Sequence, residues 1–315
     1  MKKIFALLFA AVLFGAELVP VQKTDIKAAV LDMVDDGEFI YVATDASKVV
    51  ILDRNLSVQK EIVSRKIKDF MGTLNNADIY SVDILNGKIL YLAQAEGGYA
   101  ELYVVEGEKK ELVLSKDAML YAKAAKFVDE DRAVIALMSD EVVLYDLKAK
   151  KVLKRIKAGE YFYSAMAISP KRDMVAIGDE GGEVAIIDLK SFKRVKLFKE
   201  INKDKILSIA MSEKYVVAGS RADKTFALYN IATGSAKTKK NPDFFIYVVG
   251  IAPDDSVAVY GDNEKYILKV VDTSMLEVRF LLAGHKNIVN IVHFLDPKTI
   301  LTGSETGEIL KWRLK

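Results

Sequence analysis

The chain has 315 residues, of which 51% are hydrophobic and 29% charged; it is long enough for one large domain or two ordinary ones, and this composition excludes intrinsic disorder. It contains no cysteine, which excludes disulfides, thiolate metal sites, covalent haem attachment and a cysteine-linked lipid anchor. Its 46 basic and 44 acidic side chains nearly balance, so no strong electrostatic attraction to nucleic acid or anionic lipid is expected.

The N-terminus has the pattern of a cleavable secretory signal. Lys2 and Lys3 precede an apolar run from Ile4 to Phe14, which is too short to span a bilayer, and the small residues Gly15-Ala16 follow. A buried N-terminal strand or helix is the alternative interpretation of this run. We expect residues 1–16 to be removed during export to the periplasm, leaving one domain of residues 17–315 with 44 basic and 44 acidic side chains.

The rest of the sequence consists of short apolar strands separated by turns rich in Asp, Gly, Lys and Asn. No other apolar stretch approaches the length of a membrane-spanning helix, so we expect no membrane insertion after the signal is cleaved. The clearest unit has strands at 165–169, 174–178 and 184–189, with polar turns between them.

The ending of this unit, an apolar residue followed by a polar one, recurs seven times. The pairs are Leu52-Asp53, Val105-Glu106, Tyr145-Asp146, Ile187-Asp188, Tyr229-Asn230, Val271-Asp272 and Trp312-Arg313. Their second residues are separated by 53, 40, 42, 42, 42 and 41 positions. A period in the low forties is typical of propeller blades, each a four-stranded sheet, so seven endings predict seven blades.

The repeated unit resembles the WD40 repeat, with Ile187-Asp188 at the position of the Trp-Asp pair of that family. In the last unit, Gly284-His285, the run 302–307 and Trp312 resemble further parts of the WD40 signature. The resemblance implies that His285, Thr302 and Trp312 belong to a hydrogen-bonded network inside the blade. Thr306 stands where the family has an aspartate, which implies an incomplete network.

Both ends of the sequence fit the way in which WD40 propellers close. The last unit stops at Leu314-Lys315, just after its third strand, and residues 18–22 have the pattern of a strand. WD40 propellers commonly complete the last blade with an N-terminal strand, which removes open sheet edges. We therefore predict an all-β, seven-bladed, WD40-like β-propeller that is closed by the N-terminal strand joining the last blade.

A degenerate WD40 chain of this length, with a signal and without cysteine, is similar to the NapL-type accessory proteins of periplasmic nitrate reductase systems. This resemblance implies a periplasmic protein that assists the maturation of a molybdenum-containing nitrate reductase, or its electron supply. Such a protein would not itself carry the molybdenum cofactor.

The sequence holds little catalytic apparatus. Of the two histidines, the resemblance gives His285 a structural role, and His293 is expected to be hydrogen-bonded or to face the central channel. No nucleophile elbow, phosphate loop or dinucleotide loop is present. We expect no catalytic residue, metal or cofactor, and a protein that is not an enzyme.

Two alternatives from other classes stay open. Some propeller enzymes hold calcium in the central channel, and Asn76, Asp78 and Asp83 lie near the start of one expected inner strand, although solvated turn residues are the simpler interpretation. A calcium-dependent, lactonase-like hydrolase is therefore one alternative. An outer-membrane assembly scaffold is the other, and the missing lipid-bearing cysteine argues against it.

Aromatic residues mark the expected binding face, where loops lead into the inner strands. They are Tyr80, Tyr121, Tyr161, Tyr163, Phe244, Phe245 and Tyr247, with Phe162 beside Tyr161 in the same connecting loop. Rigid aromatic rings suit protein recognition, although packing of these rings between adjacent blades is the competing interpretation. Two irregular segments, 66–76 and 237–245, are further candidates for binding, although tolerated variation and an ordinary solvated turn are the simpler interpretations. We predict a monomeric protein-interaction module whose partner is a protein, such as a component of periplasmic nitrate reductase.

Overall fold

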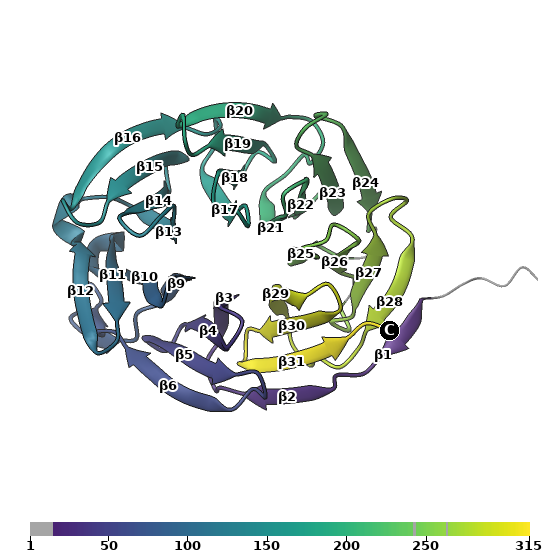
Figure 1. Ribbon diagram of the computed structural model, residues 1–315, viewed down its shortest axis with the longest axis horizontal. Helices are drawn as coiled ribbons and strands as arrows, with labels where there is room; N and C mark the ends of the chain where they lie inside the picture. Colours follow the sequence, from purple (N-terminus) through teal and green to yellow (C-terminus); the bar gives the residue numbers. More distant parts are fainter. Residues whose placement is uncertain (1–14, 242–243, 263) are drawn as a thin grey trace, which may run out of the picture.

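The computed structural model describes residues 15–241, 244–262 and 264–315. Seven β-sheets surround a central axis as the blades of a propeller (Figure 1), which confirms the predicted all-β, seven-bladed fold. Residues 1–14, which hold most of the predicted signal peptide, lie outside the described residues. In the described ranges no helix has the length and apolar character needed to cross a membrane.

The first four blades each have four antiparallel strands, in order from the axis outward. Blade 1 is β3 (Val30–Asp35), β4 (Phe39–Thr44), β5 (Lys48–Asp53) and β6 (Val58–Val63). Blade 2 is β9 (Ile79–Leu85), β10 (Lys88–Gln94), β11 (Ala100–Glu106) and β12 (Lys109–Leu114). Blade 3 is β13 (Ala122–Phe127), β14 (Arg132–Leu137), β15 (Glu141–Asp146) and β16 (Lys151–Lys157). Blade 4 is β17 (Tyr163–Ile168), β18 (Met174–Asp179), β19 (Val184–Asp188) and β20 (Lys193–Phe198).

The last three blades complete the ring, and the N-terminal segment adds one strand to each of blades 6 and 7. Blade 5 is β21 (Ile206–Met211), β22 (Tyr215–Ser220), β23 (Thr225–Asn230) and β24 (Ala236–Lys240). Blade 6 is β25 (Val249–Ile251), β26 (Val257–Gly261), β27 (Leu268–Asp272) and β28 (Val278–Leu282), with β1 (Ala16–Leu18) outside them. Blade 7 is β29 (Val289–Asp296), β30 (Thr299–Ser304), β31 (Glu308–Arg313) and, outermost, β2 (Gln22–Asp25).

The repeated sequence ending marks the same place in every blade. Each of the seven pairs, from Leu52-Asp53 to Trp312-Arg313, forms the last two residues of a third strand. The apolar member is buried in each blade, and in blades 1 to 6 the polar member stands where the chain turns toward the outer strand. The spacing on which the blade prediction depended therefore reflects one recurring structural position.

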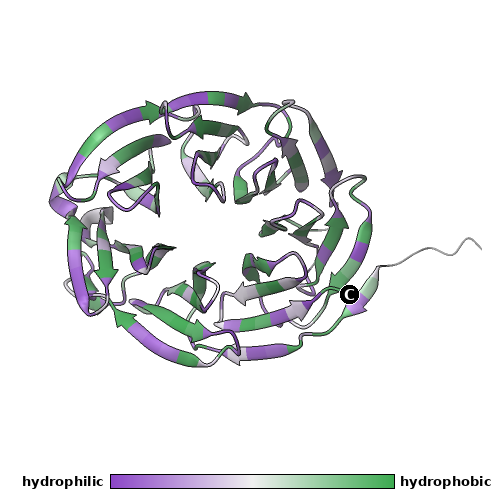
Figure 2. Cartoon of the chain, viewed as in Figure 1, coloured by the Kyte–Doolittle hydropathy of each residue, from purple (hydrophilic) through white to green (hydrophobic). Residues whose placement is uncertain are grey.

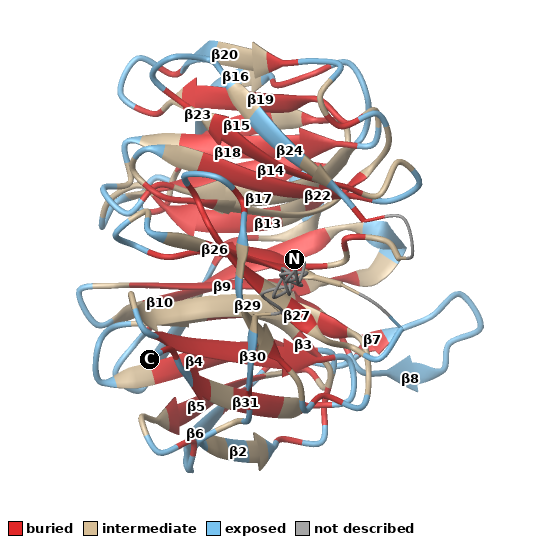
Figure 3. Cartoon of the chain, turned by 90° about the vertical axis from the view of Figure 1, so that its right-hand side faces the viewer, coloured by how far each residue is buried: buried red, intermediate tan, exposed pale blue. Residues whose placement is uncertain are grey.

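Each of the seven blade-to-blade junctions contains its own hydrophobic core. The cluster between blades 3 and 4, for example, joins Val134 and Leu144 of one sheet to Val175 and Ile187 of the next. The second and third strands are almost entirely buried, while outer strands such as β16 are exposed (Figure 3). Figure 2 shows the matching pattern, with hydrophilic residues frequent on the rim strands. Burial of apolar faces between adjacent sheets is thus the main source of stability.

Two short N-terminal strands lie on two different blades. Gln22–Asp25 pairs antiparallel with β31, so the strand on the last blade lies a few residues later than the expected 18–22. Ala16–Leu18 instead pairs in parallel with β28. Pro20 separates the two strands, and because proline has no N–H to donate, it interrupts a continuous strand at this point.

The long first interval in the repeat contains a small hairpin. It consists of β7 (Ile67–Lys68) and β8 (Leu74–Asn75), and Figure 3 shows it projecting from the body of the propeller. Two short 3₁₀ turns in blade 2 and after it, η1 (Glu96–Gly98) and η2 (Lys116–Ala118), are the helical elements of the described chain.

Candidate functional site

One end of the propeller, which we call the connecting-loop face, is built from two kinds of segment. The loops that lead from each outer strand to the next inner strand meet there with the turns between second and third strands. Backbone hydrogen bonds join them: Met138 donates to Tyr121 at 2.8 Å, and Tyr163 donates to Met138 at 3.1 Å. Glu180 likewise donates to Phe162 at 2.8 Å. These bonds fix the turns and loops of blades 3 and 4 relative to each other.

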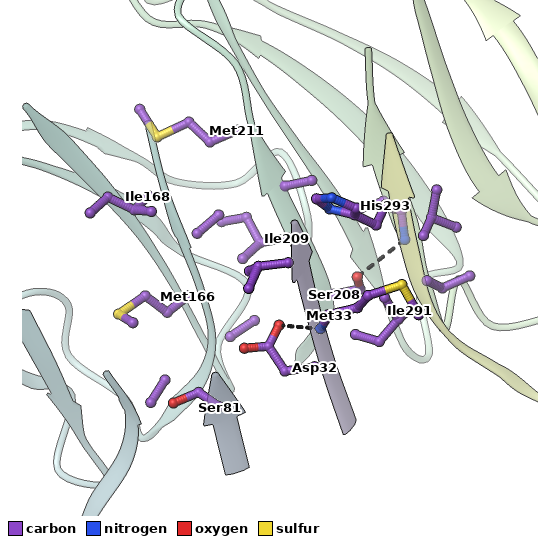
Figure 4. A pocket seen from close by; sticks show the side chains of 18 of the residues that line it. Asp32, Met33, Ser81, Met166, Ile168, Ser208, Ile209, Met211, Ile291 and His293 are labelled. Atoms are coloured by element: carbon purple, nitrogen blue, oxygen red, sulfur yellow. Dashed lines mark hydrogen bonds between the residues drawn. The ribbon is translucent and has the colours of Figure 1, made fainter. Parts of the chain in front are cut away.

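The inner strands surround a central channel of about 650 Å³ (Figure 4). Its wall is largely apolar and carries Met33, Met166, Ile168, Ile209, Met211 and Ile291. Asp78, Tyr80 and Lys123 add polar groups to the lining. Burial lowers the pKa of the Lys123 ammonium group, whose charge lies 4.9 Å from the centre of the Tyr80 ring.

Two ion pairs beside the channel each span a whole blade. Lys126 of blade 3 contacts Asp32 of blade 1 at 2.7 Å, and Val82 of the intervening strand bonds both side chains through its backbone. Arg172 of blade 4 reaches Asp83 of blade 2 with both terminal nitrogens. These charges are paired within the protein and hold neighbouring blades together.

The aromatic residues of the predicted binding face do not share one environment. Tyr80 and Tyr163 line the channel and also pack against the cores between blades. Tyr121 and Tyr161 are exposed to solvent. Tyr121 stacks on Tyr99 of blade 2, with ring centres 4.5 Å apart. Each interpretation offered by the sequence therefore describes some of the rings. Tyr121 and Tyr161 face solvent, whereas Tyr80 and Tyr163 pack between blades.

The three remaining predicted aromatics form a separate cluster at blade 6. Phe244 and Phe245 lie 5.4 and 5.8 Å from Tyr247, measured between ring centres, and all three are half-buried. They line a small hollow together with Tyr266 and Leu268. Since each ring covers another, this group presents less free apolar surface than blades 2 to 4.

Exposed apolar side chains concentrate on the connecting-loop face between the hairpin and blade 4. Eight of the seventeen large hydrophobic residues that are exposed in the described chain lie there: Phe70, Met71, Leu74, Met119, Tyr121, Met138, Tyr161 and Phe162. Phe70 at the hairpin tip is 99% exposed. Among the described residues, the turns at the opposite end contribute only Met275, and the other eight exposed residues lie on outer strands or the N-terminal segment. We call the eight exposed apolar residues on the connecting-loop face the apolar patch.

Two adjoining hollows shape the patch. One, of about 500 Å³, is lined by Met119, Tyr121 and Arg155, and the other, of about 380 Å³, by Lys123 and Lys205. Met138 and Phe162 line both hollows and form the wall between them. Lys123 also lines the channel, so the hollows lead from the rim toward the channel mouth.

Sequence reasoning missed several members of this patch. Met138 occupies the turn position that is Glu180, Arg221 and Glu305 in blades 4, 5 and 7, so a methionine among charged residues was the available signal. The patch also includes Phe70, whose segment was identified only as an irregular loop. Spacing alone gave no sign that Met119 would lie near the turn that carries Met138.

The hydrogen-bonded network expected in the last blade is present. Thr302 Oγ1 lies 2.6 Å from His285 Nε2 and accepts a bond of 2.8 Å from Trp312 Nε1. Thr306 bonds Asn287 and Ser304, and Glu308 lies 3.2 Å from His285 Nδ1. Burial lowers the pKa of His285 to about 4, so the ring is neutral at physiological pH.

Blade 5 contains a related network built from different residues. Asn202 donates to Ser220 at 2.9 Å, and the Tyr229 hydroxyl donates to Asn202. Asn202 and Tyr229 stand at positions similar to His285 and Trp312 in their blades. The same structural role is thus filled by residues outside the WD40 signature.

The remaining polar candidates are accounted for by local bonds. His293 lines the channel and its Nε2 lies 2.6 Å from Asp35, as expected of a hydrogen-bonded channel histidine. Asp83 is bound by Arg172 and by the Phe127 N–H, whereas Asn76 is exposed, so the three residues considered for calcium do not form one site. In the described part of the chain, no group of three or more His, Asp or Glu side chains could hold a metal ion.

A known protein is similar to one third of the chain. No protein-family model matches the chain. A stretch of 108 residues, 33% of the chain, is 32% identical to the putative guanine nucleotide-exchange factor SED4 of Candida glabrata. The match covers 10% of that relative. The seven-bladed arrangement itself supports the resemblance to WD40-type propellers.

Proposed function

We propose that this protein is a non-enzymatic interaction module that binds another protein through the apolar patch. The observation that carries the proposal is the concentration of eight exposed apolar side chains on one face, against one on the opposite turns. Exposed apolar clusters on a soluble domain mark interaction sites, because their burial against a partner is favourable. Aromatic residues and methionine are also enriched in protein interfaces.

The geometry of the patch favours recognition of a shaped partner surface. The hollows on either side of Met138 and Phe162 can each accept a partner side chain, while the hairpin tip with Phe70 can enter a pocket of the partner. Binding energy is usually concentrated in a few well-packed aromatic or apolar anchors. We therefore expect Phe70 and Phe162 to contribute more than the surrounding residues.

The partner and the compartment are further parts of the proposal. The signal-like N-terminus supports export to the periplasm, and the NapL-type resemblance supports a component of periplasmic nitrate reductase as partner, in maturation or electron supply. Cell fractionation tests the first part. The nucleotide-exchange activity named for the Candida relative is not carried over, because the match covers only 10% of that protein.

Binding to the purified periplasmic nitrate reductase, measured by surface plasmon resonance, tests the proposal. Met138→Ser with Phe162→Ser should weaken binding at least about tenfold, as should Phe70→Ser alone. Met275→Ser replaces a methionine on the opposite turns that is more exposed than Met138 (72% against 40%); it is the matched control and should bind normally. Equal binding by all variants would assign the interaction to another face, and no binding by the wild type would exclude this partner.

A further inference from the structure

Three carboxylate groups meet at the junction of blades 3 and 4, directly beneath the loop that carries Tyr161 and Phe162. Asp140 lies in the turn between β14 and β15, Asp179 ends β18, and Glu183 immediately precedes β19. All three residues are buried, with exposed fractions of 1%, 1% and 9%. Buried carboxyl groups normally have a cation or several hydrogen-bond donors beside them.

The three groups face one another at Gly159. A Cβ atom at this glycine would lie 2.6 Å from Asp179 Oδ2, 3.0 Å from Asp140 Oδ2 and 3.1 Å from Glu183 Oε2. Any larger residue would separate the carboxylates or be expelled by them. The absence of a side chain at this position is therefore what lets the cluster close.

The donors around the cluster satisfy only half of its oxygen atoms. Gly159 N–H donates to Asp140 Oδ2 at 2.5 Å, and the N–H groups of Gly181 and Glu183 donate to Asp179 Oδ1 at 2.9 Å. Lys199 Nζ lies 2.7 Å from Glu183 Oε1. One oxygen of each carboxyl group, namely Asp140 Oδ1, Asp179 Oδ2 and Glu183 Oε2, is buried without a partner.

The cations near the cluster do not supply the missing donors. Lys157 on β16 donates its ammonium to the Ser139 carbonyl, and Arg194 on β20 donates to the Ala158 carbonyl. Lys199 contacts Oε1 of Glu183 and leaves Oε2 without a partner. The other ionisable groups facing the cluster are Tyr163, which is neutral, and exposed Glu160, which adds negative charge.

This environment favours a bound proton. Burial raises the pKa of Asp140 to about 7, opposed by the Gly159 N–H and assisted by the charges of Asp179 and Glu183. Burial and the Glu183 charge likewise raise the pKa of Asp179. Asp179 Oδ2 and Glu183 Oε2, both without a partner, lie beside the same point at Gly159, so a proton on one of them lets it donate to the other. A metal ion is a poorer candidate, because the described residues form no group suited to hold one.

We propose that Asp140, Asp179 and Glu183 form a proton-binding site, and that loss of its shared proton to solvent at alkaline pH releases the loop of residues 158–162. The two aspartates anchor this loop: Asp140 accepts the Gly159 N–H, and its backbone carbonyl accepts the Ala158 N–H at 2.9 Å. The backbone N–H of Tyr161 interacts with Asp179. When both carboxyl groups are ionised, their repulsion pulls these anchors apart.

The site would regulate the apolar patch, because Tyr161 and Phe162 lie in the released loop. That consequence rests on the proposed function, whereas the proton site itself does not. A partner would bind the patch more tightly below the pKa of the cluster than above it. The test of the site therefore uses no partner.

Amide hydrogen exchange on the full chain tests the proposal at about pH 6 and about pH 9, after correction for the intrinsic exchange rate. In the wild type, residues 158–162 should lose protection by at least about tenfold at the higher pH. The loop of residues 283–288 in blade 7, which occupies the corresponding place, is the internal control and should change little. Unchanged protection of residues 158–162 would overturn the proposal.

Variants identify the group responsible. Asp140→Asn removes the ionisable group and keeps its shape, and asparagine tolerates the left-handed backbone at this position, where φ is 63°. Its loop should stay protected at both pH values, whereas Glu160→Gln, in the same loop but exposed, should behave as the wild type. Persistent pH dependence in Asp140→Asn would contradict the proposal. If that variant does not fold, Asp179→Asn serves the same purpose.

A bound cation is the remaining explanation for three buried carboxylates, and a calcium test distinguishes it from a bound proton. Chelator-treated protein is examined at the higher pH with and without added calcium chloride. Restored protection with calcium would show a metal site and overturn the proton proposal, and no effect of calcium would support it. The exchange experiment uses no nitrate reductase, so its failure leaves the proposed function standing. Failure of the binding experiment likewise leaves the proton site standing.

Discussion

Arg172 of blade 4 forms a bidentate ion pair with Asp83 of blade 2. Its two terminal nitrogens donate to the two carboxylate oxygens at 2.6 and 2.9 Å. The same guanidinium donates to the carbonyls of Phe127 in blade 3 and Ile84 in blade 2. One side chain thereby connects three consecutive blades. Arg172 itself has a left-handed backbone conformation, with φ of 57°. Asp83 is 2% exposed, and Arg172 is the cation bound to it.

Removing one partner of this pair should strongly destabilise the protein. We expect Arg172→Met to lower the free energy of unfolding by about 3–5 kcal/mol, because it leaves a buried carboxylate without its cation. Urea denaturation measures the change. Arg221→Met is the matched control, since Arg221 pairs with Asp204 at the surface and its loss should cost less than about 1 kcal/mol.

The double variant Asp83→Asn with Arg172→Met separates pairing from packing. If the pair acts as a unit, the double variant should lose much less than the sum of the single variants. Additive losses would show that the two side chains stabilise the fold independently.

His285 should make the protein sensitive to acid. Its pKa is lowered from 6.5 to about 4 by burial, so the unfolded chain binds a proton more readily than the folded one. Stability is therefore fully present above about pH 6.5 and falls as the pH drops toward 4, by about 2–3 kcal/mol in total. His285→Gln, measured by denaturation across this range, should lose most of the dependence, and an unchanged slope would assign acid sensitivity to other groups.

Asp140 should act in the opposite sense. Its pKa is raised from 3.8 to about 7, so the folded state binds the proton more tightly, and stability falls as the pH rises between these values. We expect Asp140→Asn to be more stable than the wild type at about pH 8, by about 1–3 kcal/mol, with the difference vanishing toward pH 4. Thermal unfolding of both proteins at several pH values measures it, and a difference that grows toward low pH would contradict the sign.

The sequence was sufficient for the ring of blades because the relevant signal is periodic. An apolar and a polar residue close every third strand, as in Leu52-Asp53 and Trp312-Arg313, and this position recurs at nearly constant spacing. The bond of Thr302 with His285 and Trp312 was likewise predictable, since these residues match a known signature. Local patterns that repeat carry fold information without any knowledge of contacts.

The candidate site was less predictable, because it depends on packing between blades. Tyr121 immediately precedes its inner strand and is exposed, whereas Tyr163 lies one position further along, as the first residue of its inner strand, and lines the channel. Alternation along a strand cannot separate them, since a shift of one residue reverses the face. Asp140 and Asp179 are far apart in the chain and lie close together only because blades 3 and 4 pack against each other. No sequence motif predicts this contact.

A substitution at Gly181 would disturb the apolar patch without replacing any of its eight residues. A Cβ atom at this position would lie 2.1 Å from Cδ2 and 2.3 Å from Cε2 of Tyr161, so the ring rests directly on the glycine. Gly181→Ala must displace the ring. Tyr161 is 53% exposed and buries little surface, so we expect the free energy of unfolding to change by less than about 1 kcal/mol. Binding to a patch partner should nevertheless weaken about threefold to tenfold, because a positioned ring is lost.

The matched control for this prediction is Gly261→Ala in blade 6. A Cβ atom there meets only Val248 and Leu268 at 3.6 and 3.9 Å, which are ordinary contacts, so neither stability nor binding should change appreciably. Surface plasmon resonance and urea denaturation on both variants measure the two quantities separately. Normal binding by Gly181→Ala would show that Tyr161 lies outside the interface and would limit it to the hollows around Met138 and Phe162. Weak binding by both variants would instead indicate a general response of the ring to substitution.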